Sequence, residues 1–95
     1  MMKQFSNNID EATLLLAEEI GGCFFSAKEA AEMLDVPEEL LLDTSEPLHQ
    51  RYRKGWLQSE FDLRKCILKL AVSGSSPAQA MAMDIQQKAK LKSLD

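Results

Sequence analysis

The chain has 95 residues and a mass of 10.7 kDa, the size of one small domain. Hydrophobic residues make up 45% and charged residues 27%, as in ordinary globular proteins, which excludes a disordered or collagen-like chain. The uncharged stretch 70–83 is interrupted by Gly, Ser and Pro and falls short of the ~20 apolar residues of a membrane span. The amino-terminal residues do not form a secretory signal. We therefore expect a cytoplasmic protein with one domain over 1–95 and no membrane partner.

The net charge of −4 hides opposite charges in the two halves of the chain. Residues 1–50 hold two Lys and eleven Asp or Glu, a net charge of −9. Residues 51–95 hold nine Lys or Arg and four Asp or Glu, a net charge of +5. This division fits a basic surface for nucleic acid, or complementary ends that let copies of the chain associate. It also fits solvated helix faces that happen to differ in charge.

The abundance of Ala, Leu, Glu and Lys, with few β-branched residues, predicts an all-α fold without a sheet. We expect a small bundle of four or five helices, near 8–20, 27–34, 37–43, 47–72 and 77–90. Asn7 or Asn8 is the predicted cap of the first helix, with Asp10 and Glu11 in its first turn, and Gly21-Gly22 is its predicted end.

Residues 26–43 have the signals of two short helices joined by a tight turn, a helix-turn-helix unit. Ser26 and Glu29 are spaced as a capping box at the start of the first of these helices. Asp35 stands in the turn, where a left-handed conformation is needed, and Asp adopts it more easily than most side chains. Pro37 suits the first position of the second helix.

The long central helix, 47–72, is apolar on two sides. Trp56, Leu63, Ile67 and Leu70 fall on one side, while Leu57, Phe61, Leu68 and Val72 fall on the other. Such a helix is either central to its own fold or shared with a partner subunit. Gly74 is expected to take the left-handed position after this helix, with Ser76 as the cap and Pro77 as the first residue of the last helix.

The predicted core comprises Leu16, Ile20, Ala31, Leu34, Val36, Leu41, Leu63, Ile67 and Leu70. Cys23 and Cys66 have no paired metal-ligand spacing and are interpreted as small buried hydrophobes. His49 is the only histidine, and a surface or helix-end position is expected for it. Because the chain has no nucleotide, metal or nucleophile motif, we expect no enzyme activity, no catalytic residue, no cofactor and no metal site.

Two stretches of the chain have more specific patterns. The segment 26–41 has the spacing of bacterial and phage helix-turn-helix units, with Ala31 at the close approach of the two helices and Asp35 where the motif usually has Gly. The second stretch runs from Tyr52-Arg53-Lys54-Gly55 through Glu60, Leu63-Arg64, Leu70-Ala71 and Gly74 to Ala78-Gln79-Ala80-Met81. This second stretch resembles the segment that follows the helix-turn-helix in many small subunits of phage terminases. The resemblance covers about residues 26–85, and it rests on order and spacing more than on any single motif.

This resemblance implies a phage or prophage protein that recognises double-stranded DNA for packaging. Such proteins act as homo-oligomers, hand the DNA to a large terminase subunit and carry no catalytic residues. The second helix of the unit usually enters the major groove, but here 37–43 is acidic and opposes phosphate binding. The candidate DNA contacts are Ser26 and Lys28, then Arg51, Arg53 and Lys54, with Lys65 and Lys69 further along the long helix.

The sequence also permits an alternative from another class, an all-helical protein-protein interaction or oligomerisation module without nucleic-acid binding. The two-sided long helix and the opposite charges of the two halves both favour association. Five methionines, including Met33, Met81 and Met83, suit an adaptable apolar surface. DNA binding through several cations weakens steeply with salt, and this dependence separates the two hypotheses.

Overall fold

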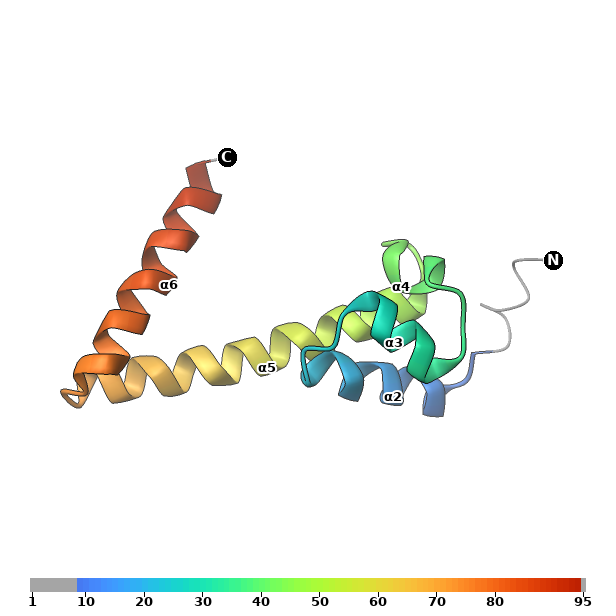
Figure 1. The fold of residues 1–95 in the computed structure, drawn as a ribbon, viewed down its shortest axis with the longest axis horizontal. Helices are drawn as coiled ribbons and strands as arrows, with labels where there is room; N and C mark the ends of the chain where they lie inside the picture. Colours follow the sequence, from blue (N-terminus) through green and yellow to red (C-terminus); the bar gives the residue numbers. More distant parts are fainter. Residues whose placement is uncertain (1–8, 95) are drawn as a thin grey trace. The chain divides into compact units, whose positions relative to one another are not determined.

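The computed structural model describes residues 9–94, in which every regular element is a helix (Figure 1). The helices are α2 (Glu11–Gly22), α3 (Ala27–Leu34), α4 (Glu39–Leu42), α5 (Pro47–Val72) and α6 (Ser76–Leu94). No strand occurs in this part of the chain, so the predicted all-α fold is confirmed. None of these helices is both long and apolar enough to cross a membrane.

The chain groups into two compact units, and the boundary between them falls within α5. The N-terminal unit ends at Glu60, and the C-terminal unit begins at Phe61. The first contains α2, α3, α4 and the first half of α5, while the second contains the rest of α5 and α6. The single domain predicted for 1–95 stays a prediction.

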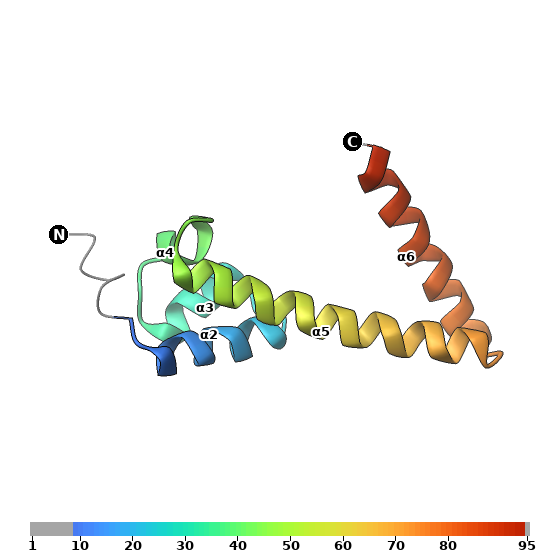
Figure 2. The same ribbon diagram turned by 180° about the vertical axis from the view of Figure 1, so that it is seen from behind.

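The core of the N-terminal unit lies where α2, α3 and α4 gather around the start of α5 (Figures 1 and 2). α3 contacts both α2 and α4. The buried residues of this core are Ala17, Ile20, Ala30, Ala31, Leu40, Leu41, Leu48 and Tyr52. Burial raises the pKa of the Tyr52 phenol, whose hydroxyl donates a hydrogen bond of 2.6 Å to the Phe25 carbonyl. This bond ties the loop before α3 to α5.

Two glycines let α2 and α5 approach at backbone distance. A Cβ atom added to Gly55 would overlap the carbonyl oxygen of Glu18, and one added to Gly21 would overlap the carbonyl oxygen of Tyr52. Each glycine therefore lies against the backbone of the opposite helix. Leu48, Tyr52 and Gly55 are the buried residues of α5, and they fall on one side of it. This seam, rather than either of the predicted apolar sides, faces the core.

Asp10 caps α2, which corrects the predicted start of the first helix. Its Oδ1 atom accepts a 3.0 Å hydrogen bond from the Thr13 backbone N–H and one of 2.8 Å from the Thr13 hydroxyl. The Thr13 backbone bond is the larger cause, ahead of the hydroxyl bond, of the lowered pKa of the Asp10 carboxyl. Asp10 is therefore the cap and not a first-turn residue, while Asn7 and Asn8 lie outside the described residues.

The end of α2 places an aromatic residue in an unusual backbone conformation. Phe24 has a φ of 66°, in the left-handed region that Gly usually occupies after a helix. Its ring meets the ring of Trp56 edge to face, with 4.4 Å between centroids. Such aromatic pairs contribute about 0.5–1.5 kcal/mol, similar to the cost of the left-handed backbone. The ring contact thus offsets the strain at Phe24.

The C-terminal unit consists of the second half of α5 and α6, which a tight turn joins at an open angle (Figure 1), and it has little core of its own. We call this pair of helices the hairpin. Gly74 makes the turn with a φ of 104°, as predicted, while the Ser75 hydroxyl accepts from the Ala78 N–H. The cap of α6 is therefore Ser75 and not the predicted Ser76, which is already the first residue of the helix. Among the hydrophobic residues described in this unit, Ala78 is buried. The exposed large side chains are Phe61, Leu63, Leu68, Leu70, Val72, Met81, Met83 and Leu91.

Several predicted core residues are exposed. Leu16 is 45% exposed, Leu63 52% and Leu70 50%, so their assignment to the core is wrong. Leu16 lies on the outward side of α2, and the two others belong to the hairpin, where the described part of the chain supplies little to cover them. Cys23 and Cys66 are also exposed, contrary to expectation. Ile20, Ala31 and Leu41 are buried as predicted, whereas Leu34, Val36 and Ile67 are half-buried.

Candidate nucleic-acid interface

The segment from α3 to α4 has the turn that the sequence predicts. The Ser26 hydroxyl accepts from the Glu29 N–H, and the Glu29 carboxylate accepts from the Ser26 N–H, which forms the expected capping box. Asp35 ends α3 in the left-handed conformation, with a φ of 58°. The N–H of Val36 then donates to the carbonyl of Ala31. This turn redirects the chain so that Leu40 and Leu41 of α4 reach the core.

The second helix of this pair is short and presents carboxylates. It spans Glu39–Leu42, so Pro37 and Glu38 precede it rather than forming its first turn. Glu38 and Glu39 are exposed. Asp43 accepts from the Ser45 backbone N–H and hydroxyl, and the backbone bond is the larger cause of the lowered pKa of this carboxyl. A polyanion would meet three carboxylates at this helix.

A histidine bond holds α4 against α5. The Nδ1–H of His49 donates to the carbonyl of Leu41 over 2.7 Å, so this nitrogen carries a proton. His49 lies in the first turn of α5 and is half-buried, which agrees with the predicted helix-end position. The bond satisfies a carbonyl in the last turn of α4. The His49 side chain therefore has a structural role, because it links the start of α5 to α4.

Arg51 is held by two carboxylates of α2 and is not an open phosphate contact. Its Nη1 donates to Glu11 over 2.9 Å, and its Nε donates to Glu18 over 3.0 Å. The Glu11 bond is the larger cause, ahead of the Glu18 bond, of the raised pKa of this guanidinium. The Arg51 side chain is only 23% exposed. Its contacts support a structural role between α5 and α2.

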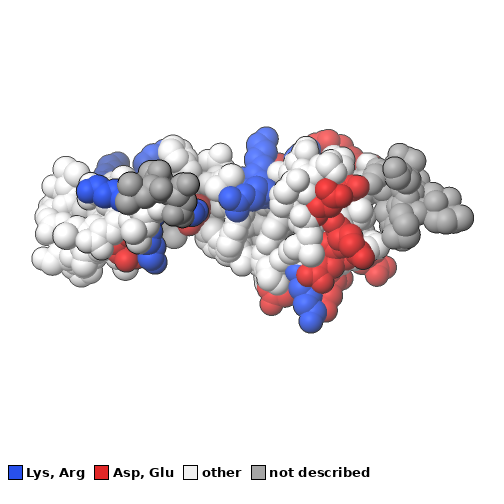
Figure 3. Space-filling view, turned by 90° about the horizontal axis from the view of Figure 1, so that it is seen from above, with Lys and Arg blue, Asp and Glu red and all other residues white. Residues whose placement is uncertain are grey.

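Three other predicted cations of the N-terminal unit are exposed. Arg53 and Lys54 lie on α5 away from the buried seam, and Lys28 lies in the first turn of α3. Carboxylates nevertheless gather on the visible face of this unit, as Figure 3 shows in red. Lys28, Arg53 and Lys54 are therefore the predicted cations of this unit whose side chains are open to solvent.

The hydroxyl and the backbone N–H of Ser26, the two groups that could bind a phosphate, already have partners within the protein. Its hydroxyl and backbone N–H are both bonded to Glu29, whose carboxylate also brings a negative charge to the start of α3. We expect Ser26→Ala to lower the free energy of unfolding by about 1 kcal/mol, because the cap is lost. Ser26→Asp should keep the stability, since Asp also caps helices. Urea denaturation checks both, and equal stability of the Ala variant would contradict the capping role.

Lys65 and Lys69, the two remaining predicted contacts, lie in the C-terminal unit. The ammonium group of Lys65 lies 4.9 Å from the centroid of the Phe61 ring, a cation–π contact one turn along α5. Lys69 is exposed in the last turn of α5. The candidate contacts are thus divided between the two units, with Ser26, Lys28, Arg51, Arg53 and Lys54 in the first.

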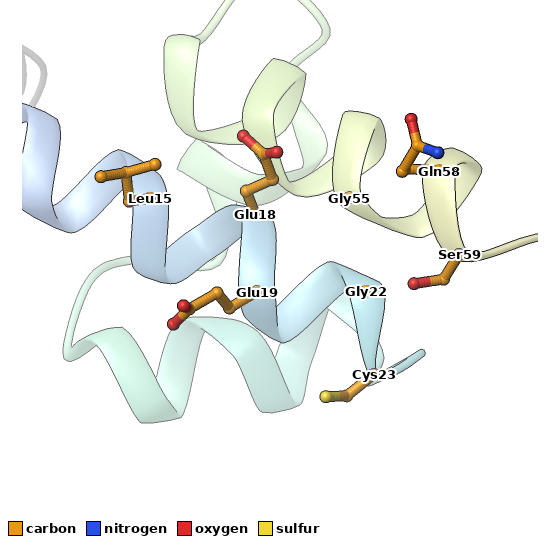
Figure 4. A pocket seen from close by; sticks show the side chains of 8 residues that line it. All are labelled: Leu15, Glu18, Glu19, Gly22, Cys23, Gly55, Gln58 and Ser59. Carbon is orange, nitrogen blue, oxygen red and sulfur yellow. The ribbon is translucent and has the colours of Figure 1, made fainter. Parts of the chain in front are cut away.

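A groove lies between α2 and α5, and no pattern in the sequence predicts it (Figure 4). It has a volume of about 530 Å³, and Gly22 and Gly55 leave room for it because they have no side chains. Its lining residues are Leu15, Glu18, Glu19, Gly22, Cys23, Gly55, Gln58 and Ser59. Apolar and carboxylate side chains therefore share one recess, which suits a cationic group with an aliphatic stem.

No signal in the sequence pairs the two helices that build this groove, because Glu18 and Gly55 are far apart in the chain.

Among the described residues, no group of three His, Cys, Asp or Glu side chains is arranged to hold a metal ion. Comparisons with protein-family models, curated proteins and solved structures find no match for this chain.

Proposed function

We propose that this protein binds double-stranded DNA without catalysing a reaction, in the manner of the small terminase subunits that it resembles. The observation that carries the proposal is the α3–turn–α4 segment, with its capping box, left-handed Asp35 and buried Ala31. These are the features by which a helix-turn-helix unit holds its two helices together. Exposed cations on the adjoining α5 supply the phosphate contacts.

Arg53 and Lys54 are the central phosphate contacts of the proposal, with Lys28, Lys65 and Lys69 as accessory ones. Phosphate contacts provide most of the affinity of such proteins, and the acidic α4 cannot provide it. Arg51 contributes indirectly, because its bonds to Glu11 and Glu18 fix α5 against α2. Binding in this mode depends on salt more than on base sequence.

The protein acts as a homo-oligomer in this proposal. The hairpin of the C-terminal unit exposes eight large apolar side chains, Val72 by 88% and Leu91 by 65%. A hollow of about 420 Å³ on this unit is lined mainly by Leu68, Ala82, Met83 and Ile85. Apolar surface of this extent usually marks a contact with another chain. Copies joined in this way would present several DNA-binding units to one duplex and hand the DNA to a large terminase subunit in the cytoplasm.

Replacing Arg53 and Lys54 together by Ala should nearly abolish DNA binding in a mobility-shift assay. Each lost phosphate contact lowers the salt dependence of log K by about one unit, so the double variant should lose about two. The loss should be similar on different DNA sequences, because phosphates carry no sequence information. Arg51 is left in place, since its removal would leave Glu11 and Glu18 without their partner.

The matched control neutralises the acidic helix with Glu38→Gln and Glu39→Gln. This pair should leave DNA binding intact or strengthen it, because two repelled charges are removed. If the Arg53 and Lys54 variant bound normally while the Gln variant lost binding, α4 would read base edges and the proposed phosphate contacts would be wrong.

The acidic surface of the N-terminal unit and the exposed hairpin favour a second candidate, an interaction module without nucleic-acid binding. In that case the wild-type protein shows no affinity for DNA even at low salt, whereas light scattering still reports association. The same assay therefore decides between the two functions.

A further inference from the structure

The side of α2 next to α5 carries an exposed apolar residue between two carboxylates. Leu15 is 50% exposed, and Glu11 and Glu19 lie four residues before and after it, which puts the three side chains on one face of the helix. We call these three residues the α2 face. Leu15 and Glu19 also line the groove beside α5, as Figure 4 shows. A partner that covers this face must bring both apolar surface and positive charge.

The end of α6 has the opposite pattern. Leu91 is 65% exposed, and Lys88 lies three residues before it, on the same side of the helix. Lys92 is four residues after Lys88, so the two lysines are neighbours of each other, and Lys92 lies ~100° around the axis from Leu91. We call these three residues the α6 end. Residues 85–92 hold three lysines and no carboxylate. Lys88 has a partner in Asp84 at 3.2 Å, and both of these side chains are largely exposed.

We propose that the α6 end of one copy docks on the α2 face of a second copy. Leu91 would pack against Leu15, while the lysines meet Glu19 and reach the carboxylate-lined groove, and Glu11 keeps its bond to Arg51. The partner is a second copy because each surface has its complement in the same chain, with −9 in residues 1–50 and +5 in residues 51–95. This inference deepens the homo-oligomer of the proposed function and rests on it.

The contact is head-to-tail, because it joins two different surfaces. Each copy that has docked its α6 end still offers its own α2 face, so the contact repeats until a ring closes. It differs from a face-to-face dimer of hairpins, which would leave the α2 face uncovered. Its charged part also weakens as salt is added, since the carboxylates and lysines are exposed before docking.

Two charge reversals test the contact without touching the internal ion pairs. Glu19→Lys spares Glu11 and Glu18, which hold Arg51, and Lys92→Glu spares the pair of Lys88 with Asp84. Each reversal alone should weaken association at low salt by about tenfold in sedimentation velocity, because an attraction becomes a repulsion. A mixture of the two variants should recover association, since each reversed surface then meets an opposite charge on the other chain. Mixing cannot restore a contact made within one chain.

Matched substitutions on α3 serve as controls. Glu32→Lys makes the same charge change at another exposed site, and Met33→Ser removes an apolar side chain that is 53% exposed. Both should associate like the wild type, whereas Leu15→Ser should weaken association. Suppose that the wild-type protein assembles, but that neither reversal changes its mass distribution or that mixing the two variants restores no association. The head-to-tail contact is then wrong, whereas the homo-oligomer of the proposed function is unaffected. If the wild type is a monomer at every salt and protein concentration, the oligomer of the proposed function is wrong as well.

Discussion

Gly55→Ala should destabilise the N-terminal unit by about 3 kcal/mol or more, a large part of the stability of a domain of this size. A Cβ atom on residue 55 would overlap the carbonyl oxygen of Glu18 and lie 2.7 Å from its carbonyl carbon. These are backbone atoms of α2, so no side-chain rotation relieves the overlap. The two helices must separate, and the separation disturbs Leu48 and Tyr52, which are buried in the same seam.

Helix propensity alone predicts the opposite sign for this substitution. In an exposed helix interior, Ala is more favourable than Gly by about 1 kcal/mol. The sign of the measured change therefore reports whether α2 and α5 cross at Gly55. Equilibrium unfolding in urea, followed by circular dichroism, measures it.

The adjacent glycines of α2 supply a matched pair of controls. A Cβ on Gly21 would overlap the carbonyl oxygen of Tyr52, so Gly21→Ala should be as damaging as Gly55→Ala. A Cβ on Gly22 would have the Ser59 hydroxyl oxygen as its nearest neighbour, at 3.1 Å, and that side chain can rotate. Gly22→Ala should thus change stability by less than about 1 kcal/mol. A Gly55→Ala variant more stable than the wild type would refute the close crossing.

Local signals made the helix bounds predictable. The capping box of Ser26 and Glu29 and the breaker at Pro47 place helix starts within a few residues, and α3 and α5 have the predicted bounds. The left-handed turns at Asp35 and Gly74 follow from the same short-range chemistry. The start of α2 was misplaced because several residues near it can act as caps, and only the structure shows that Asp10 does.

Long-range pairing was not predictable from the same signals. Apolar residues occur on several sides of α5, so periodicity alone selected Leu63 and Leu70, whereas the structure buries Leu48 and Tyr52. The deciding feature is the pair of glycines that admits α2, and no local pattern connects residue 21 with residue 55. Small residues at a crossing carry no hydrophobic signal of their own.

The ion pairs of the candidate interface were likewise not predictable from local signals in the sequence. In the sequence, Arg51, Arg53 and Lys54 form one basic group. In the structure, Arg51 pairs with Glu11 and Glu18, which lie 40 and 33 residues earlier in the chain. Adjacent residues on a helix point in different directions, so a basic run divides into structural and exposed members once its neighbours are known.

Ala31→Glu should unfold the N-terminal unit at neutral pH. Ala31 is 4% exposed and belongs to the core formed by α2, α3, α4 and α5, and its carbonyl accepts the bond that closes the turn at Asp35. A buried carboxylate without a partner costs several kcal/mol, which is comparable with the whole stability of a small unit. Thermal melts followed by circular dichroism measure the loss.

The pH dependence of the stability of Ala31→Glu separates the cost of the buried charge from the cost of the larger side chain. Burial would raise the pKa of the new carboxyl above its unfolded value, so the charge penalty is absent at low pH and grows as pH rises through the raised pKa. The variant should therefore lose less stability, relative to wild type, at pH 4 than at pH 7. Met33→Glu makes a similar change two residues along α3, where the side chain is 53% exposed, and should melt within a few degrees of the wild type at both values. A cooperative melt of Ala31→Glu like that of Met33→Glu at pH 7 would show that residue 31 is open to water and that α3 does not pack on the core through Ala31.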